Sequence, residues 1–78
     1  MGLSTLRRRF RLAIGQSLHE WVLQRRLARA RQLLGETNRP IKAIAAELGY
    51  NDVFFFSNQF RQHAGVSPAA YRKSRQTE

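Results

Sequence analysis

Arginine dominates the side chains of this sequence that could do chemistry. Twelve of the 14 basic residues are Arg, against five Asp and Glu, which gives the 78 residues a net charge of +9 and a pI near 11.7. Arg7, Arg8, Arg9 and Arg11 stand close together with no acidic residue among them. Like charges at neighbouring helix positions repel unless an anion binds between them, and a guanidinium pairs with two oxygens of a phosphate or two acceptors of guanine. The pattern favours a polyanionic partner, either nucleic acid or an anionic membrane surface.

A second set of chemically useful side chains lies between residues 53 and 61. Successive residues of a helix differ by about 100°, so the three consecutive phenylalanines at 54–56 cannot all face one core. Phe54, Asn58 and Arg61 share the side away from the predicted core. Two interpretations of Phe54 and Phe55 stay open. They contact a neighbouring helix or an absent domain, or they contact a thymine methyl group or deoxyribose.

Catalytic and metal sites are not predicted. His19 and His63 lie on different predicted helices without a paired acid, and the sequence has no cysteine. A histidine in such a setting is typically structural or exposed. We therefore predict that the protein is not an enzyme and has no metal ion or cofactor.

The stretch from residue 40 to 65 has the form of a helix-turn-helix. Pro40 suits the first turn of a helix, and Gly49 reaches the left-handed conformation needed for the sharp turn that follows. Asn51 or Asp52 can cap a second helix, which ends near Ala64 before Gly65. The predicted core residues recur at helical spacing on both helices: Ile41, Ile44, Ala45 and Leu48, then Val53 at the edge, Phe56, Phe60 and Ala64.

Two further helices are predicted before this motif. The first runs from about Leu3 or Ser4 to Ile14, stops at Gly15, and has a core face of Leu3, Leu6, Phe10, Ala13 and Ile14. A capping box, Ser17 and Glu20, starts the second, which extends from Leu18 to about Leu34 and stops at Gly35. Its apolar residues form two groups, as in a helix that packs against two separate units: Leu18, Trp21 and Val22, then Leu23, Leu27, Ala30 and Leu34.

Two side chains in these predicted elements have specific expected surroundings. Arg26 lies between the two apolar groups, so we expect it to be partly buried and paired with an acid or a helix C-terminus rather than with DNA. Tyr71 belongs to a short terminal helix, Ala69 to Lys73, which Ser67 and Pro68 begin. It is expected to pack on the helix-turn-helix, and residues 74–78 are expected to form a frayed tail.

Five motifs connect the chain to a known family: LRRRFR at 6–11, RLARARQLL at 26–34, PIKAIAAELGY at 40–50, FSNQFR at 56–61 and GVSPAAYR at 65–72. The chain resembles the DNA-binding domain of the AraC/XylS family of bacterial transcription regulators. The resemblance implies an all-α fold of two helix-turn-helix units, with homeodomain-like three-helical packing, joined by a long connecting helix. It also implies that the chain starts at the recognition helix of the first unit, so that either the sequence is a fragment of a longer regulator or the first unit is incomplete. The resulting divisions are 1–15, the connecting helix 16–36, the complete second unit 37–73 and the tail 74–78.

The resemblance also assigns candidate roles. Phosphates would be contacted by Arg11 and Arg61, and bases by Ser4, Arg7, Arg8, Val53, Phe54 and Asn58. Many family members have Arg in place of Asn58 and a small or polar residue in place of Phe54, so the base preference there is open. The implied partner is double-stranded promoter or operator DNA, with RNA polymerase as a further candidate. The effector domain is absent from this chain, and the oligomeric state is open.

Two other function classes compete with DNA recognition. A membrane-surface module would need one continuous unburied apolar face, whereas the apolar faces here divide among several helices. A protein-interaction or assembly fragment, with only non-specific electrostatic DNA binding, would use Phe54 and Phe55 against another chain. We predict no membrane partner and a cytoplasmic location, since the sequence lacks a membrane-spanning run and a signal peptide.

Overall fold

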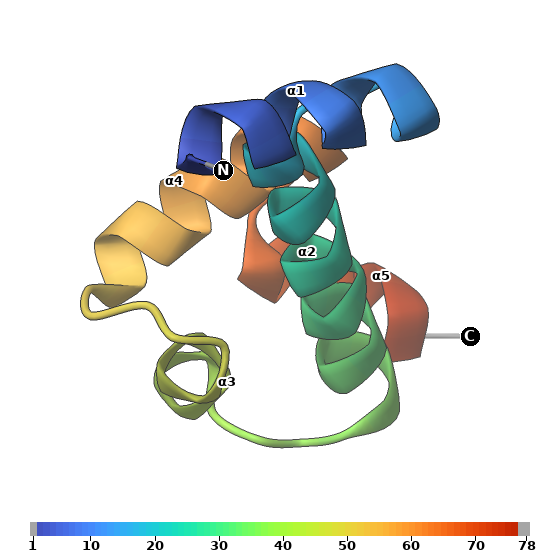
Figure 1. The fold of residues 1–78 in the computed structure, drawn as a ribbon. Helices are drawn as coiled ribbons and strands as arrows, with labels where there is room; N and C mark the ends of the chain where they lie inside the picture. Colours follow the sequence, from blue (N-terminus) through green and yellow to red (C-terminus); the bar gives the residue numbers. More distant parts are fainter. Residues whose placement is uncertain (1, 77–78) are drawn as a thin grey trace.

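A long central helix, α2 (Leu18–Glu36), connects two unequal parts of the molecule (Figure 1). The computed structural model describes residues 2–76 and, within them, all side chains except those of Leu3, Ser4 and Ile14. The described residues form five α-helices and no strand, which confirms the all-α prediction. The other helices are α1 (Leu3–Ile14), α3 (Ile41–Glu47), α4 (Val53–Ala64) and α5 (Pro68–Gln76).

The core lies where the C-terminal half of α2 meets α3, α4 and α5. It has the apolar stripes expected from the sequence, with the addition of Leu33 and Tyr50: Leu27, Ala30, Leu33, Leu34, Ile44, Ala45, Tyr50, Phe56 and Phe60. Phe56 and Phe60 are completely buried one helical turn apart on α4. Tyr71 of α5 closes the core as predicted, its ring edge-on to Phe60 at a centroid distance of 5.6 Å.

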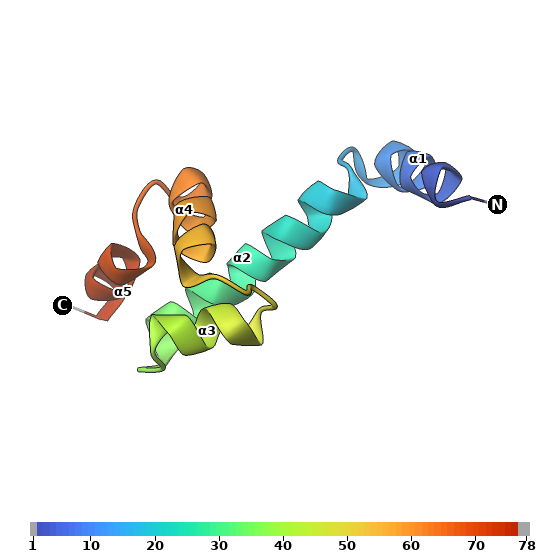
Figure 2. The same ribbon diagram turned by 90° about the vertical axis from the view of Figure 1, so that its left-hand side faces the viewer.

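Helix α1 lies at the opposite end of α2, away from this core (Figure 2). It packs through Phe10, whose ring meets Trp21. The prediction that Leu6 and Ala13 belong to a core was wrong, because both are exposed, Leu6 by 57%. Helical periodicity identifies an apolar face, but burial requires a neighbouring element over that face, and none of the described elements covers this part of α1.

The separation of α1 from the other helices makes the molecule elongated. Its principal extents are 48 × 25 × 19 Å and its radius of gyration is 14.7 Å, whereas a compact chain of this length has a radius of gyration of about 11.5 Å. The two helices predicted to be recognition helices, α1 and α4, therefore lie at different positions along the long helix α2.

Local caps define most of the helix ends. Gly15, Gly49 and Gly65 all have positive φ at the turns predicted for them. Ser17 caps α2 by accepting a hydrogen bond from the Glu20 N–H at 3.1 Å. Of the two candidate caps for α4, Asp52 is the one used, since its carboxylate accepts from the Phe54 N–H at 2.8 Å.

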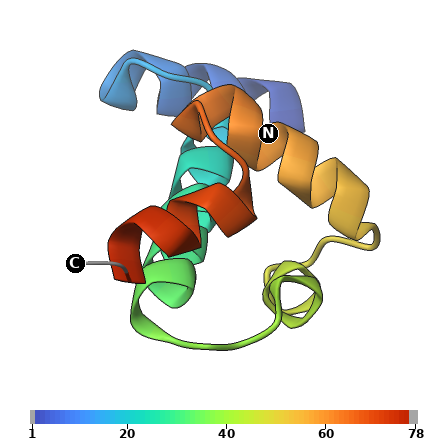
Figure 3. The same cartoon turned by 180° about the vertical axis from the view of Figure 1, so that it is seen from behind.

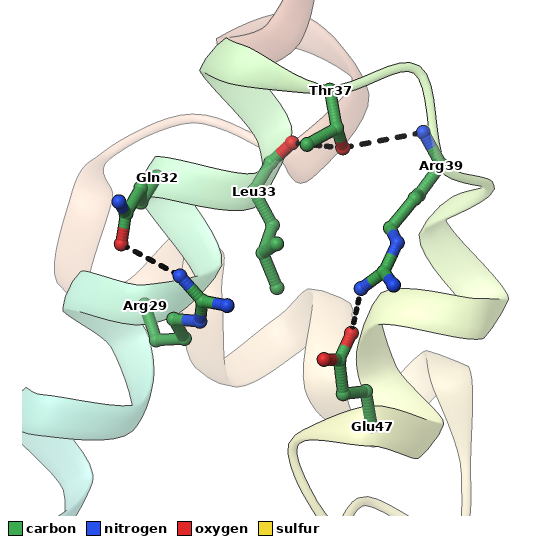
Figure 4. A network of polar contacts seen from close by, with 6 residues as sticks. All are labelled: Arg29, Gln32, Leu33, Thr37, Arg39 and Glu47. Atoms are coloured by element: carbon green, nitrogen blue, oxygen red, sulfur yellow. Dashed lines mark hydrogen bonds and ion pairs between the residues drawn. The ribbon is translucent and has the colours of Figure 1, made fainter.

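The predicted stop at Gly35 was wrong, because α2 continues through Glu36. The helix ends at Thr37, whose hydroxyl donates to the Leu33 carbonyl at 2.6 Å and accepts from the Arg39 N–H at 3.3 Å (Figure 4). An ion pair between Arg39 and Glu47 then fixes the connection to α3. Side-chain capping thus replaces the left-handed glycine as the stop signal.

The C-terminal helix is longer than predicted. Helix α5 extends to Gln76, so residues 74–76 of the predicted tail are helical, while residues 77–78 lie outside the described range. Arg72 and Gln76 both donate to the Leu34 carbonyl, at 3.2 and 3.3 Å, and Gln76 also donates to the Thr37 carbonyl at 3.0 Å. These long-range bonds satisfy carbonyls at the end of α2 and hold the last turn of α5. None of the described helices is long and apolar enough to span a bilayer.

Candidate nucleic-acid interface

Helices α1 and α4 present their N-terminal ends on the same side of the molecule. Both helices begin on the left in Figure 1 and on the right in Figure 3, where the molecule is seen from behind. Figure 2, which faces that side, shows the two helices separated along α2. The positive end of each helix dipole therefore points the same way.

On α1, three arginines line one hollow with the first turn of α2. Arg7, Arg8 and Arg11 border a space of about 550 Å³ together with Ser17, Leu18 and His19. All three arginine side chains are exposed. The sequence had placed them on a face opposite the core, and the structure adds that the start of the next helix adjoins that face. The Ser4 side chain, also proposed for base contact, lies outside the described residues.

On α4, the exposed side is formed by Phe54, Phe55, Asn58 and Arg61. Phe54 is 75% exposed and lies two residues after the Asp52 cap. Asn58 and Arg61 line a shallow hollow of about 350 Å³ with Gln62 and Gly65. Val53 is only half-buried, packed at the edge of the core as predicted.

The buried side of α4 determines which residues it displays. Phe56 and Phe60 are fixed in the core, which turns Phe54 and Asn58 outward because residues two positions from a buried one lie on a different side of the helix. Arg61, which directly follows Phe60, is rotated from it by about 100° and is exposed as well. Of the three consecutive phenylalanines, only Phe56 is buried. The sequence predicted that at least one would be displayed, and two are.

The candidate arginines have no acidic partners among residues 2–76. Arg7, Arg8, Arg11 and Arg61 form neither an ion pair nor a side-chain hydrogen bond with the described residues. Unpaired guanidinium groups on an exposed surface keep their full capacity for phosphate or base edges. The described residues also contain no group of three or more His, Cys, Asp or Glu side chains that could hold a metal ion.

The expected surroundings of Arg26 were only partly right. Its side chain is half-buried, but its partner is the ring of Tyr50, with the guanidinium carbon 5.2 Å from the ring centroid. Tyr50 in turn donates from its hydroxyl to Oε1 of Gln59 on α4 at 2.5 Å. Neither contact was predicted from the sequence, although Tyr50 directly follows the turn glycine Gly49 within the PIKAIAAELGY motif.

Comparison with known proteins bears on this arrangement. A family model described as a helix-turn-helix domain matches residues 1–74. The HTH-type transcriptional activator RhaR of Pectobacterium carotovorum is 42% identical over 69 residues, which cover 88% of this chain and 24% of RhaR. The arabinose operon regulatory protein of Escherichia coli is 33% identical over 69 residues, covering 88% of this chain and 24% of that protein. This chain belongs to the AraC family of helix-turn-helix transcription regulators.

Solved structures agree with the family assignment. The C-terminal domain of AraT, a response regulator from Geobacillus stearothermophilus, superposes with a TM-score of 0.94 at 32% identity, covering 100% of this chain and 64% of that one. The DNA-binding domain of AdpA, solved in complex with a target DNA, has a TM-score of 0.88 at 31% identity, covering 95% of this chain and 67% of that one. The family and fold are those of DNA-binding transcription regulators, not of enzymes. This AraC-family chain spans only 18% to 27% of the length of the first relatives it matches.

Proposed function

We propose that this AraC-family chain binds double-stranded DNA in a sequence-specific manner, with α1 and α4 entering successive segments of the major groove. The observation that supports this most is the shared direction of the two helices, which display basic or amide side chains and begin on one side of the molecule. Recognition helices contact base edges mainly through their N-terminal residues. The 48 Å length of the molecule accommodates two grooves about 34 Å apart.

The proposal divides the exposed side chains into two roles. Arg7, Arg8, Phe54 and Asn58 contact bases, together with Ser4 and Val53. Arg8 suits a bidentate contact with guanine, Asn58 suits adenine, and the Phe54 ring suits a thymine methyl group. Arg11 and Arg61 contact phosphates and fix the register of the protein on the duplex.

The biological setting follows from the proposed activity. The target is promoter or operator DNA, and RNA polymerase at the same promoter is a second proposed partner. Under this proposal the chain works in the cytoplasm, where bacterial DNA lies.

A second candidate function rests on the exposed apolar side chains. Leu6 and Leu12 on α1 and Phe54 and Phe55 on α4 are all exposed, and exposed apolar groups of this size suit contact with another protein chain. In that case DNA binding would be electrostatic only.

Fluorescence anisotropy separates the two functions. The duplex that the protein enriches from a random pool is titrated beside a scrambled duplex at several salt concentrations. Specific binding predicts a higher affinity for the enriched duplex that persists as salt rises, because base contacts release no counterions. Equal affinities at every salt concentration, together with concentration-dependent association in light scattering, would leave the interaction fragment as the better description.

A further inference from the structure

We infer that Arg26 is a positioning residue for DNA recognition, which sets the orientation of α4 through a cation–π contact with the Tyr50 ring. The inference rests on the proposed function, because it assigns a residue of the connecting helix to the accuracy of the second reading surface. Arg26 itself contacts no base in this arrangement.

A continuous chain of contacts leads from Arg26 to α4. The Arg26 guanidinium carbon lies 5.2 Å from the centre of the Tyr50 ring, within the range of an attractive cation–π contact. The Tyr50 hydroxyl donates to Oε1 of Gln59 at 2.5 Å. Gln59 directly follows Asn58, the candidate adenine contact. The hydrogen bond from Tyr50 therefore holds α4 next to the residue proposed to contact adenine.

Tyr50 contacts both α3 and α4. The residue is only 7% exposed, and its backbone N–H donates to the Ala45 carbonyl of α3 at 2.9 Å. Its ring centroid lies 5.1 Å from that of Phe56 and 6.1 Å from that of Phe55, both on α4. Tyr50 therefore joins α3 and α4, and Arg26 joins that pair to α2.

The chemistry of the contact favours arginine. Arg26 forms no ion pair or hydrogen bond with the described residues, so the cation–π contact with Tyr50 is its main defined interaction. Arg26 lines a hollow of about 360 Å³ together with Asp52. The Oδ1 atom of Asp52 accepts a hydrogen bond from the Phe54 N–H. A guanidinium offers an aromatic ring a broad, weakly hydrated planar group, whereas a lysine ammonium at this position keeps the charge but not that planar group.

The preceding residue makes the matching contact with the other unit. The Arg25 guanidinium lies 5.0 Å from the centre of the Trp21 ring, and Trp21 is the partner of Phe10 on α1. Arg25 and Arg26 are consecutive on α2. They thus contact the aromatic residue next to α1, Trp21, and the one next to α4, Tyr50. Because α2 carries both units, the orientation that Arg26 gives α4 also sets its spacing from α1.

The test uses four variants and one selected duplex. The wild-type chain first selects its site from randomised duplexes. Arg26→Lys, Tyr50→Phe, the double variant and a control, Arg29→Lys, are then titrated against the selected duplex, a scrambled one, and one with a base pair inserted between the two halves. Arg29 is the matched control because it lies on the same helix, exposed, and bonds only to Gln32 of α2 among the described residues. Thermal melts and the salt dependence of affinity are recorded for each.

We expect Arg26→Lys and Tyr50→Phe each to lower the ratio of selected to scrambled affinity by roughly three- to tenfold. The discrimination against the inserted base pair should fall as well. The melting temperature should stay close to that of Arg29→Lys, and the salt dependence should not change, because the charge is kept. The double variant should lose less than the product of the two single losses, since both act on one chain of contacts.

Three results would overturn the inference. Arg26→Lys could match Arg29→Lys in every affinity. A further variant that removes the charge, Arg26→Gln, is titrated beside these four. It could weaken selected and scrambled duplexes equally, with a smaller salt dependence, while Arg26→Lys binds normally, which would make Arg26 a phosphate contact. The ratio of selected to scrambled affinity could also return to the wild-type value once the affinities are corrected for the unfolded fraction of each variant. Arg26 would then contribute to stability alone. Failure of the proposed function would look different, because the wild-type chain would then select no sequence at all.

Discussion

The rings of Phe10 and Trp21 meet edge to face, with centroids 5.5 Å apart and planes inclined by 72°. This pair attaches α1 to the start of α2. Leu6 and Leu12 of the same helix are 57% and 80% exposed, so they add little to the attachment. Among the described side chains of α1, Phe10 is therefore the apolar one that attaches the arginine-bearing helix to α2.

Replacing this phenylalanine should loosen α1 without unfolding the rest. We expect Phe10→Ala to weaken the attachment of α1 by at least about 0.5–1.5 kcal/mol, the contribution of an aromatic pair beyond its buried area. Hydrogen exchange should then speed up for amides of α1 and stay slow for α4, whose core residues are remote. DNA affinity should fall because the first reading surface is no longer fixed.

Leu12→Ala is the control for this change. Its side chain is mostly exposed, so stability should change by no more than about 0.5 kcal/mol. Equal acceleration of exchange in α1 and α4 by Phe10→Ala would show that the two ends of the molecule unfold as one unit.

Arg8 and Arg61 should differ in how they affect DNA binding. Arg8→Ala should cost about 1–3 kcal/mol on the preferred site and relax the preference at one base pair, whereas Arg61→Ala should weaken all duplexes alike. Anisotropy titrations against single-base variants of the site measure both effects. Arg29→Ala controls for the loss of one charge, and a uniform loss for both Arg8→Ala and Arg61→Ala would refute the division into base and phosphate contacts.

Phe54 and Phe56 are two residues apart yet should behave in opposite ways. Phe54→Ala should leave the free energy of unfolding within about 0.5 kcal/mol of the wild type, because the ring is 75% exposed. It should weaken binding only to duplexes with a thymine at the contacted position. Phe56→Ala empties a fully buried site and should cost about 3–5 kcal/mol.

Thermal melts followed by circular dichroism, with anisotropy on thymine and uracil duplexes, check these expectations. Uracil lacks the methyl group that the Phe54 ring would contact. A wild-type protein that binds thymine and uracil duplexes equally would remove the proposed role of Phe54 in base recognition.

Periodicity and turn chemistry predicted most of the second unit. Gly49 and Gly65 mark real helix ends because only a left-handed residue satisfies the turn there, and the stripe from Ile44 to Phe60 is buried because several helices converge on it. These signals are local, so they can be read from neighbouring residues in the chain.

The sequence failed where a distant partner decides the outcome. Leu6 has the right spacing for a core residue, but none of the described elements covers it. Arg26 has an aromatic ring as its partner rather than an acid, and that ring lies 24 residues further along the chain. The candidate contacts of Arg7, Arg8 and Asn58 follow from family resemblance and exposure, so DNA-binding measurements on variants have to decide them.

Gly35 and Gly49 should respond to alanine with opposite signs. Gly49 has a φ of +93°, so Gly49→Ala should destabilise the protein by about 1–2 kcal/mol through backbone strain alone, since no atom lies within 4 Å of the added Cβ. Gly35 lies inside α2, and its added Cβ would meet Arg75 Nε at 3.6 Å, an ordinary contact. Gly35→Ala should therefore stabilise the protein by up to about 1 kcal/mol, the helix propensity difference between the two residues. Urea unfolding followed by circular dichroism measures both, and a loss of stability for Gly35→Ala as large as that for Gly49→Ala would mean that α2 ends at Gly35 after all.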